Sequence, residues 1–266
     1  MSRTVHVIGI GAGDPAHLTL QAIAAMNTVD VFFTIDKGAH AGDLAALRTE
    51  LLARHVARPY RVVAAPEAER DRTLDNSAAD YTAVVADWQA ARGAAYARMI
   101  AEELPDGGVG GFLVWGDPAL YDGTLRLLQD VPGIEVTSIP GISSVAALAA
   151  AHRLILNRPG RPVVVTTGRR IADEGMPAGF DDVVVMLDGR TAFAALPDLD
   201  LDIYWGAYLG TADEVLVAGD LHTMRDRIVQ VRAEARARKG WIMDTYLLRR
   251  RAPGMSARPP SGPNPS

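Results

Sequence analysis

The sequence predicts an α/β protein of two domains, with a mostly parallel five-stranded sheet in the first and a mixed sheet in the second. Short runs rich in β-branched and aromatic residues alternate with longer amphipathic segments, an alternation typical of parallel sheets. Two prolines and a glycine at residues 157–162 interrupt this pattern. We therefore expect domains at 1–156 and 157–250. Residues 251–266, rich in Pro, Ser and Gly, have little to bury and are expected to form a disordered tail.

Each expected strand is a short apolar run bounded by turn residues, and helical periodicity is strongest in two segments. Apolar residues recur at helical spacing through 18–26, and residues 221–238 form a charged helix. The strands expected in the first domain are 5–10, 29–35, 60–63, 109–115 and 134–139. Those expected in the second domain are 163–167, 183–187, 203–208, 214–217 and 241–248.

The composition excludes several classes of protein. The chain has 266 residues, of which 48% are hydrophobic, so it can bury a sizeable core. It contains no cysteine, which excludes disulfides, thiolate catalysis and zinc ribbons. There is no targeting pattern and no apolar run of about 18 residues, so we expect a cytoplasmic protein without a membrane partner. A net charge of −5 argues against nucleic acid as a partner.

The first expected strand ends in a glycine-rich loop that resembles the turn of a dinucleotide-binding protein. That fingerprint requires glycine at its first, third and sixth positions. Gly9 and Gly11 satisfy the first two positions, but the sixth is Asp14. An aspartate there places a negative charge where a pyrophosphate would bind the helix N-terminus. The loop therefore argues against a dinucleotide.

Two further loops follow expected strands of the same sheet. Gly116-Asp117-Pro118 follows one strand, and Pro140-Gly141 with the helix-capping pair Ser143-Ser144 follows the next. In open α/β sheets, ligands bind at the carboxyl ends of the strands, so the three loops could face one site. Ordinary turn chemistry is the alternative for any single loop. A hydrolase nucleophile elbow is excluded, because Val145 stands where that motif requires glycine.

Taken together, the three loops resemble those of the tetrapyrrole methylases, the class III S-adenosylmethionine-dependent methyltransferases. Within that family, longer stretches resemble one member closely, including "FLVWGDPALYDGTLRLL" and "IYWGAYLGTADEVLVAG", and the resemblance covers about residues 4–250. It implies C1-methylation of precorrin-5 with release of acetate in aerobic cobalamin biosynthesis. It also implies S-adenosylmethionine as donor, S-adenosylhomocysteine as product and a homodimer. Ala12 and Ser143 are small departures, since many members have proline and threonine there.

The resemblance also implies which residues form the site, in a ligand trough between the two domains. The implied donor-binding residues are Ala12, Asp117, Leu120, Ser143, Ser144, Leu187 and Ala207. The implied substrate-binding residues are Gly11, Gly13, Asp14, Tyr121, Arg153, Arg169 and Arg170. Arginine suits a substrate with acetate and propionate arms because it pairs bidentately with carboxylates. Further candidate cations are Arg48, Arg70, Arg72, Arg158 and Arg161, although each could equally be an ordinary surface residue.

Asp36 and Lys37 end the second expected strand and are the candidate catalytic residues. This pair could bind a carboxylate arm or position the water that removes the acetyl group. An exposed ion pair in a turn is the alternative.

Other functions stay open on the sequence alone. A methylase of the same fold could act on another precorrin, on RNA or on a protein, and a non-catalytic tetrapyrrole or nucleotide binder is also possible. The six histidines show no metal-binding spacing, so we expect no metal.

Overall fold

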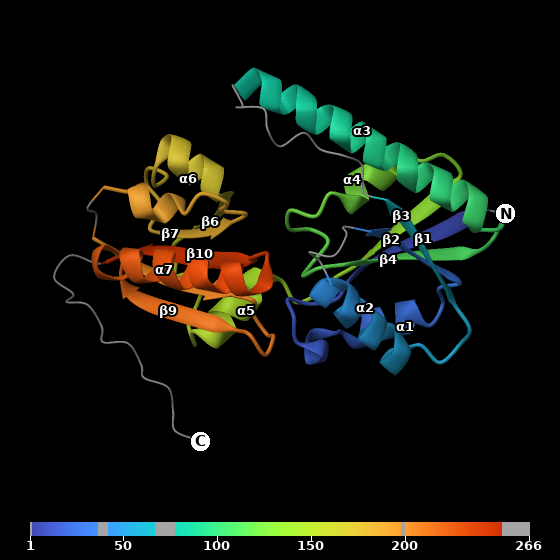
Figure 1. Cartoon of the computed structure of the whole chain (residues 1–266), viewed down its shortest axis with the longest axis horizontal. Coiled ribbons are helices and arrows are strands. Elements are labelled where there is room, and N and C mark those ends of the chain that lie inside the picture. The colour runs from blue at the N-terminus through green and yellow to red at the C-terminus, as the bar shows by residue number, and fades with distance from the viewer. Residues whose placement is uncertain (1, 37–41, 67–77, 198–199, 252–266) are drawn as a thin grey trace. The chain divides into compact units, whose positions relative to one another are not determined.

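A computed structural model describes residues 2–36, 42–66, 78–197 and 200–251. The chain divides into two compact units, Met1–Ser143 and Ser144–Ser266, and each contains one five-stranded sheet (Figure 1). The predicted α/β class, with a mostly parallel sheet followed by a mixed sheet, is confirmed. Within the described ranges, no helix is long and apolar enough to cross a membrane.

The sheet of the first unit is parallel throughout, with the strand order β3-β2-β4-β1-β5. Its strands are β1 (Arg3–Gly9), β2 (Val31–Asp36), β3 (Arg61–Pro66), β4 (Val109–Val114) and β5 (Ile134–Ile139). Its helices are η1 (Pro15–His17), α1 (Leu20–Met26), α2 (Gly42–His55), α3 (Ala78–Glu103) and α4 (Thr124–Gln129).

Helices cover both faces of this sheet, as Figure 1 shows for α1 and α2 on one face and α3 and α4 on the other. Alternate residues of β1 therefore enter two separate cores. Val5 and Val7 pack with α3 and α4, whereas Ile8 packs with α1 and α2. Burial on both faces explains why β4 is a continuous apolar run. All five strands end at one edge of the sheet, where their loops can form a common site.

The sheet of the second unit is mixed and has the order β6-β7-β10-β8-β9. Only the β6–β7 pair is parallel among the described strands of this sheet. The strands are β6 (Val163–Thr167), β7 (Asp182–Met186), β8 (Leu201–Ala207), β9 (Val215–Asp220) and β10 (Asp244–Arg250). The helices are α5 (Ser144–Ala151), α6 (Gly168–Glu174), η3 (Ala192–Ala195) and α7 (Leu221–Lys239).

Helix α5 belongs to the second unit, although it follows the last strand of the first sheet directly. It packs on β8 and β10, and Leu148 lies against Gly206, where an added Cβ would come within 2.9 Å of the leucine. His152 Nε2 lies 3.0 Å from the backbone oxygen of Trp205 and donates to it, since a carbonyl can only accept. The units therefore divide earlier in the chain than the 157–162 segment at which composition predicts a boundary.

The described strands agree with the predicted strands to within a few residues at either end. Arg251, the first residue of the predicted tail, is instead attached to the second sheet. Its backbone N–H donates to the Asp200 oxygen at 2.9 Å, and its guanidinium contacts Asp220 at 2.6 Å. The remaining tail residues, 252–266, lie outside the described part of the chain.

Replacing His152 with glutamine should reduce the loss of stability at acidic pH. Burial lowers the pKa of His152 below its ordinary value of 6.5, with smaller opposing effects from the Trp205 carbonyl and Glu214. The unfolded chain therefore binds a proton more readily, so this contribution to stability is present above pH 6.5 and is lost as the pH falls below it. Glutamine can still donate to Trp205 but does not titrate. Between pH 7 and pH 5, the free energy of unfolding in urea should decrease less for the variant than for the wild type. Equal decreases would contradict a lowered pKa of His152.

Candidate active site

Three loops at the carboxyl edge of the first sheet meet through their backbones. An added Cβ on Gly141 would lie 2.2 Å from the backbone oxygen of Gly116, and one on Gly9 would lie 2.7 Å from the Gly141 nitrogen. No side chain fits at either position without displacing backbone. Glycine at residues 9 and 141 therefore allows the loops after β1, β4 and β5 to touch.

The Asp117 carboxylate connects two of these loops. Its Oδ1 accepts a hydrogen bond from Ala119 N at 2.8 Å, within its own loop, and its Oδ2 accepts from Gly141 N at 2.9 Å. Gly11 and Gly116 exchange two backbone hydrogen bonds of 3.3 and 2.8 Å, which attach the first loop as well. The predicted convergence of the three loops is thus observed within this unit. The half-buried carboxylate has further acceptor capacity, since an ionised carboxylate offers about four lone-pair positions.

Asp14 and Gly11 shape the first loop. Asp14 caps the short helix η1, and its Oδ1 accepts from Ala16 N at 2.7 Å. Gly11 has φ +85°, and an added Cβ there would lie 2.3 Å from the Cβ of His17. The aspartate occupies the position in which a dinucleotide would meet the helix N-terminus, as its charge predicts.

In the second unit, three of the predicted donor-binding positions gather around the start of β10. Thr245 pairs with Met186 in β7 and with Gly206 in β8, so Leu187 and Ala207 each follow a residue that flanks it. The Thr245 hydroxyl also donates to Ser144 Oγ at 3.3 Å. Ser144, Leu187 and Ala207 therefore lie at one edge of the second sheet.

The backbone at this edge is conformationally unusual. Leu187 and Tyr208 have φ values of 55° and 50°, in the left-handed region that non-glycine residues rarely occupy. Such a conformation costs about 1–3 kcal/mol and persists only where the surroundings hold it. Leu187 is 64% exposed, whereas Ala207 is fully buried.

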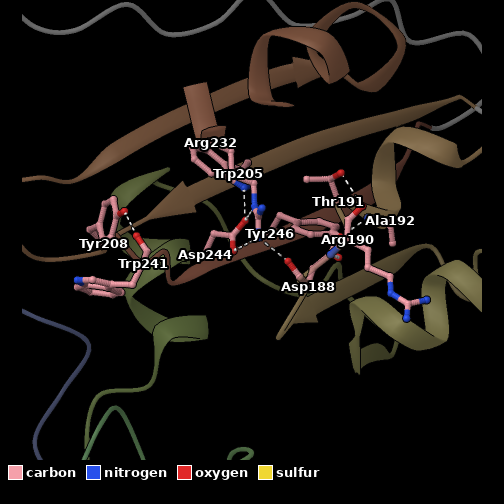
Figure 2. A network of polar contacts seen from close by, with 10 residues as sticks. All are labelled: Asp188, Arg190, Thr191, Ala192, Trp205, Tyr208, Arg232, Trp241, Asp244 and Tyr246. Carbon is pink, nitrogen blue, oxygen red and sulfur yellow. Dashed lines mark hydrogen bonds and ion pairs between the residues drawn. The ribbon is translucent and has the colours of Figure 1, made fainter. Parts of the chain in front are cut away.

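A network of buried polar side chains holds the loop after β7 (Figure 2). Asp188 accepts from the backbone nitrogens of Arg190 and Ala192 at 3.0 and 2.7 Å. Its Oδ2 also accepts the hydroxyl hydrogen of Tyr246 at 2.8 Å. Burial, together with the neighbouring Asp188 carboxylate, raises the pKa of Tyr246, so the phenol stays protonated and donates.

Arg232 extends this network to β8 and β10, as Figure 2 shows. Its Nη2 donates to the Asp188 backbone oxygen at 2.7 Å, and its Nε donates to Asp244 Oδ2 at 2.9 Å. Trp205 Nε1 donates to the same carboxylate oxygen at 2.9 Å. Burial raises the pKa of Asp244, while the bond from Arg232 opposes that shift. On the other side, the Tyr208 hydroxyl donates to the Trp241 oxygen at 2.6 Å and fixes the loop after β8.

The predicted arginines differ in what their side chains contact. Arg170 donates from Nε and Nη2 to both carboxylate oxygens of Glu174 at 3.1 and 2.9 Å, so this side of its guanidinium already holds a carboxylate one turn along its own helix. Arg158 contacts the fully buried Asp182 at 3.1 Å. Arg153, just after α5, and Arg169, in α6, are exposed. A substrate-binding role for Arg153 and Arg169 stays a prediction.

Of the other predicted residues of the first unit, Ala12, Leu120 and Tyr121 belong to these loops. Ala12 is buried, with 3% of its surface exposed, while Tyr121 is 47% exposed with φ 53°. Leu120 is half-buried, and its backbone N–H donates to the backbone oxygen of Asp117 at 3.2 Å. Asp36 ends β2, but its side chain is not described, and Lys37, like Arg70 and Arg72, lies outside the described residues.

The buried network of the second unit was not predicted from the sequence. One signal was available in the glycine of "TTGRR", Gly168, which begins α6. An added Cβ there would lie 2.4 Å from the Cβ of Asp188, so this glycine makes room for the aspartate. The tyrosine in the apolar run of β10 was a second signal, because a buried Tyr hydroxyl requires a partner.

The chain is similar to known proteins along most of its length. Residues 4–225 match the family model of the Tetrapyrrole (Corrin/Porphyrin) Methylases, and the chain therefore belongs to the tetrapyrrole methylase family. The predicted family and enzyme class, a methyltransferase, are confirmed. The chain is 45% identical over 255 residues to a curated precorrin-6A synthase (deacetylating) from Sinorhizobium sp., covering 94% of this chain and 96% of the relative.

Solved structures show the same fold. A cobalamin synthesis related protein (CobF) from Corynebacterium diphtheriae is 36% identical, with a TM-score of 0.77 and coverage of 94% of this chain and 99% of that protein. A uroporphyrin-III C-methyltransferase from Thermus thermophilus, solved in complex with S-adenosylhomocysteine, is 18% identical with a TM-score of 0.55. It covers 92% of this chain and 96% of the Thermus protein, and this likeness shows the fold alone.

Replacing Gly141 with alanine should destabilise the first unit. The added Cβ would overlap the backbone oxygen of Gly116, which cannot rotate away as a flexible side chain would. We expect a loss of about 1–3 kcal/mol in the free energy of unfolding. Gly93→Ala, inside α3, is the control, because its Cβ would meet Leu127 at an ordinary 3.9 Å. That substitution should stabilise by roughly 0.5–1 kcal/mol in urea unfolding. Equal effects of the two substitutions would contradict the backbone contact.

Replacing Tyr246 with phenylalanine should weaken the support of the loop after β7. The Asp188 carboxylate would lose its hydroxyl donor while keeping the two backbone donors. We expect a cost of about 1–2 kcal/mol in urea unfolding, because a buried carboxylate loses one of its bonds. Unchanged unfolding would show that the hydroxyl contributes nothing to holding this loop.

Proposed function

We propose that the protein uses S-adenosylmethionine to methylate C1 of precorrin-5, releases acetate and forms precorrin-6A in aerobic cobalamin biosynthesis. The observation that carries this proposal is the 45% identity to precorrin-6A synthase, which extends over both units. The intact loop cluster of the first unit and the supported edge of the second unit are consistent with it.

The chain contributes binding and alignment to methyl transfer. The donor supplies a methyl group attached to a positively charged sulfur. Asp117 has spare acceptor capacity for a hydroxyl or ammonium group, and Ser143 and Ser144 offer hydroxyls. Ala12 and Ala207 are buried and stay predicted donor positions, while the exposed Leu187 offers an apolar surface. Correct alignment of reacting groups can lower a barrier by up to about 7–11 kcal/mol, so we assign positioning as the main catalytic contribution.

The two substrate-facing groups that the sequence singles out remain part of the proposal. Gly11, Gly13, Asp14 and Tyr121 would border the tetrapyrrole from the first unit, with Arg153 and Arg169 from the second. Asp36 and Lys37 would act at the end of β2, either on a carboxylate arm or on the water that attacks the acetyl group.

The proposal extends to assembly, compartment and metal content. We propose a cytoplasmic homodimer on the basis of the family resemblance and the absence of cysteine. Among the described residues, no group of three or more His, Asp or Glu side chains could hold a metal ion. The reaction proposed here uses none.

Labelled methyl transfer to precorrin-5 tests the proposed function. The full chain, incubated with precorrin-5 and methyl-labelled S-adenosylmethionine, should give one labelled methyl group and one acetate for each tetrapyrrole consumed. Product mass and free acetate are followed together. S-adenosylhomocysteine should raise the melting temperature with the logarithm of its concentration, and NADH should not. Methylation without acetate would reject the deacetylating step, and no transfer would reject the proposed substrate.

A further inference from the structure

The first unit contains a small cavity that the predicted donor site does not use. Its volume is about 70 Å³, and it lies at the carboxyl ends of β2 and β4, the same sheet edge as the three loops. Each water molecule of the liquid takes up about 30 Å³, so the cavity admits only a few non-hydrogen atoms and not a macrocycle. Its polar or charged lining residues are Thr34, Arg48, Arg92, Tyr96, Asp122 and Thr124.

Two arginines from different helices enter this cavity. Arg48, from α2, is anchored by a hydrogen bond of 3.1 Å from its Nε to the Leu113 backbone oxygen. Arg92, from α3, donates from Nη2 to the Tyr96 hydroxyl at 2.9 Å, and its guanidinium lies 4.8 Å from the centre of the Trp88 ring. These contacts hold both guanidinium groups in place before any ligand binds, which reduces the entropy lost on binding.

The positive charge in the cavity exceeds the negative charge of its described lining. Asp122 is the single carboxylate among the described lining residues, and its Oδ1 already accepts from Thr124 N at 2.8 Å. The Nε of Arg92 is buried and has no hydrogen-bond partner among the described residues. Burial lowers the pKa of Arg48, and the nearby Tyr96 and Asp122 oppose that shift only in part. A buried cation with unused donors is costly unless an anion or another acceptor approaches it.

We propose that this cavity is a binding site for one carboxylate group, held by Arg48 and Arg92. The size of the cavity, the two anchored guanidinium groups and the buried unpaired Nε all fit a planar anion of few atoms. The identity of the ligand rests on the proposed function. That reaction offers two carboxylates, an arm of the tetrapyrrole and the acetate that is released.

Arg48→Met and Arg92→Met, made separately in the full chain, test the site. Arg54→Met and Arg98→Met are matched controls, because these arginines lie on the same two helices and are exposed. Binding of carbon-13 acetate is followed by NMR, with acetamide as the uncharged comparison, and the affinity for precorrin-5 is measured separately. Loss of one charged hydrogen bond should weaken the affected ligand about ten-fold or more. Affinity for S-adenosylhomocysteine should not change.

The two binding measurements, with acetate and with precorrin-5, distinguish the source of the carboxylate. Weaker acetate binding with unchanged precorrin-5 affinity identifies a site for the released product. Weaker precorrin-5 binding identifies a site for a substrate arm, whether or not free acetate is detected. The proposal is overturned if folded Arg48 and Arg92 variants bind both ligands as the controls do. If the wild-type protein does not methylate precorrin-5, the proposed function fails, whereas the acetate measurement still decides on the cavity.

Discussion

The hydrogen bond from the Gly141 amide to the Asp117 carboxylate determines how the first unit presents its ligand-facing loops. Parallel strands only bring loops to a common edge, and each loop could leave that edge in its own direction. Here the carboxylate reaches from the loop after β4 to the loop after β5, and the glycine backbones close the remaining distance. The hydrogen bond and the absence of Cβ atoms act together. If Gly9 or Gly141 carried a side chain, the loop after β5 could not come this close to the loops after β1 and β4.

In the second unit, too, an aspartate carboxylate fixes a loop at the end of a strand. Asp188 follows a strand, as Asp117 does, and accepts two backbone N–H groups in the next turn. In both units, the carboxylate that shapes the loop is therefore engaged with backbone. The difference lies in burial, because Asp188 is 4% exposed. Its carboxylate also accepts from the Tyr246 hydroxyl, and Arg232 donates to its backbone oxygen. A fully bonded buried network also rigidifies its surroundings.

Much of the fold was predictable because strand runs, glycine turns and helix caps are local features of sequence. The three loops were predictable for the same reason, and their order along the chain indicated the family. The contacts that each polar side chain makes could not be predicted from the sequence. Arg170 looks like a free cation until its helix places Glu174 one turn away, and Arg92 looks like an ordinary helix residue until Tyr96 and a cavity surround it. Which sheet α5 would cover was equally hidden, since an alanine-rich helix can pack on either neighbour.

The position of β10 in the second sheet determines when that sheet can form during synthesis of the chain. This strand is the third of five in the second sheet, yet the ribosome makes it after the other four. Until residues 244–250 emerge, β7 and β8 have no central partner, and their apolar edges stay open. The first sheet has all of its strands once Ile139 has been made, so it can form during translation. A nascent chain therefore passes through a stage in which a finished unit carries an unclosed sheet, and exposed apolar edges make that stage the one most prone to aggregation.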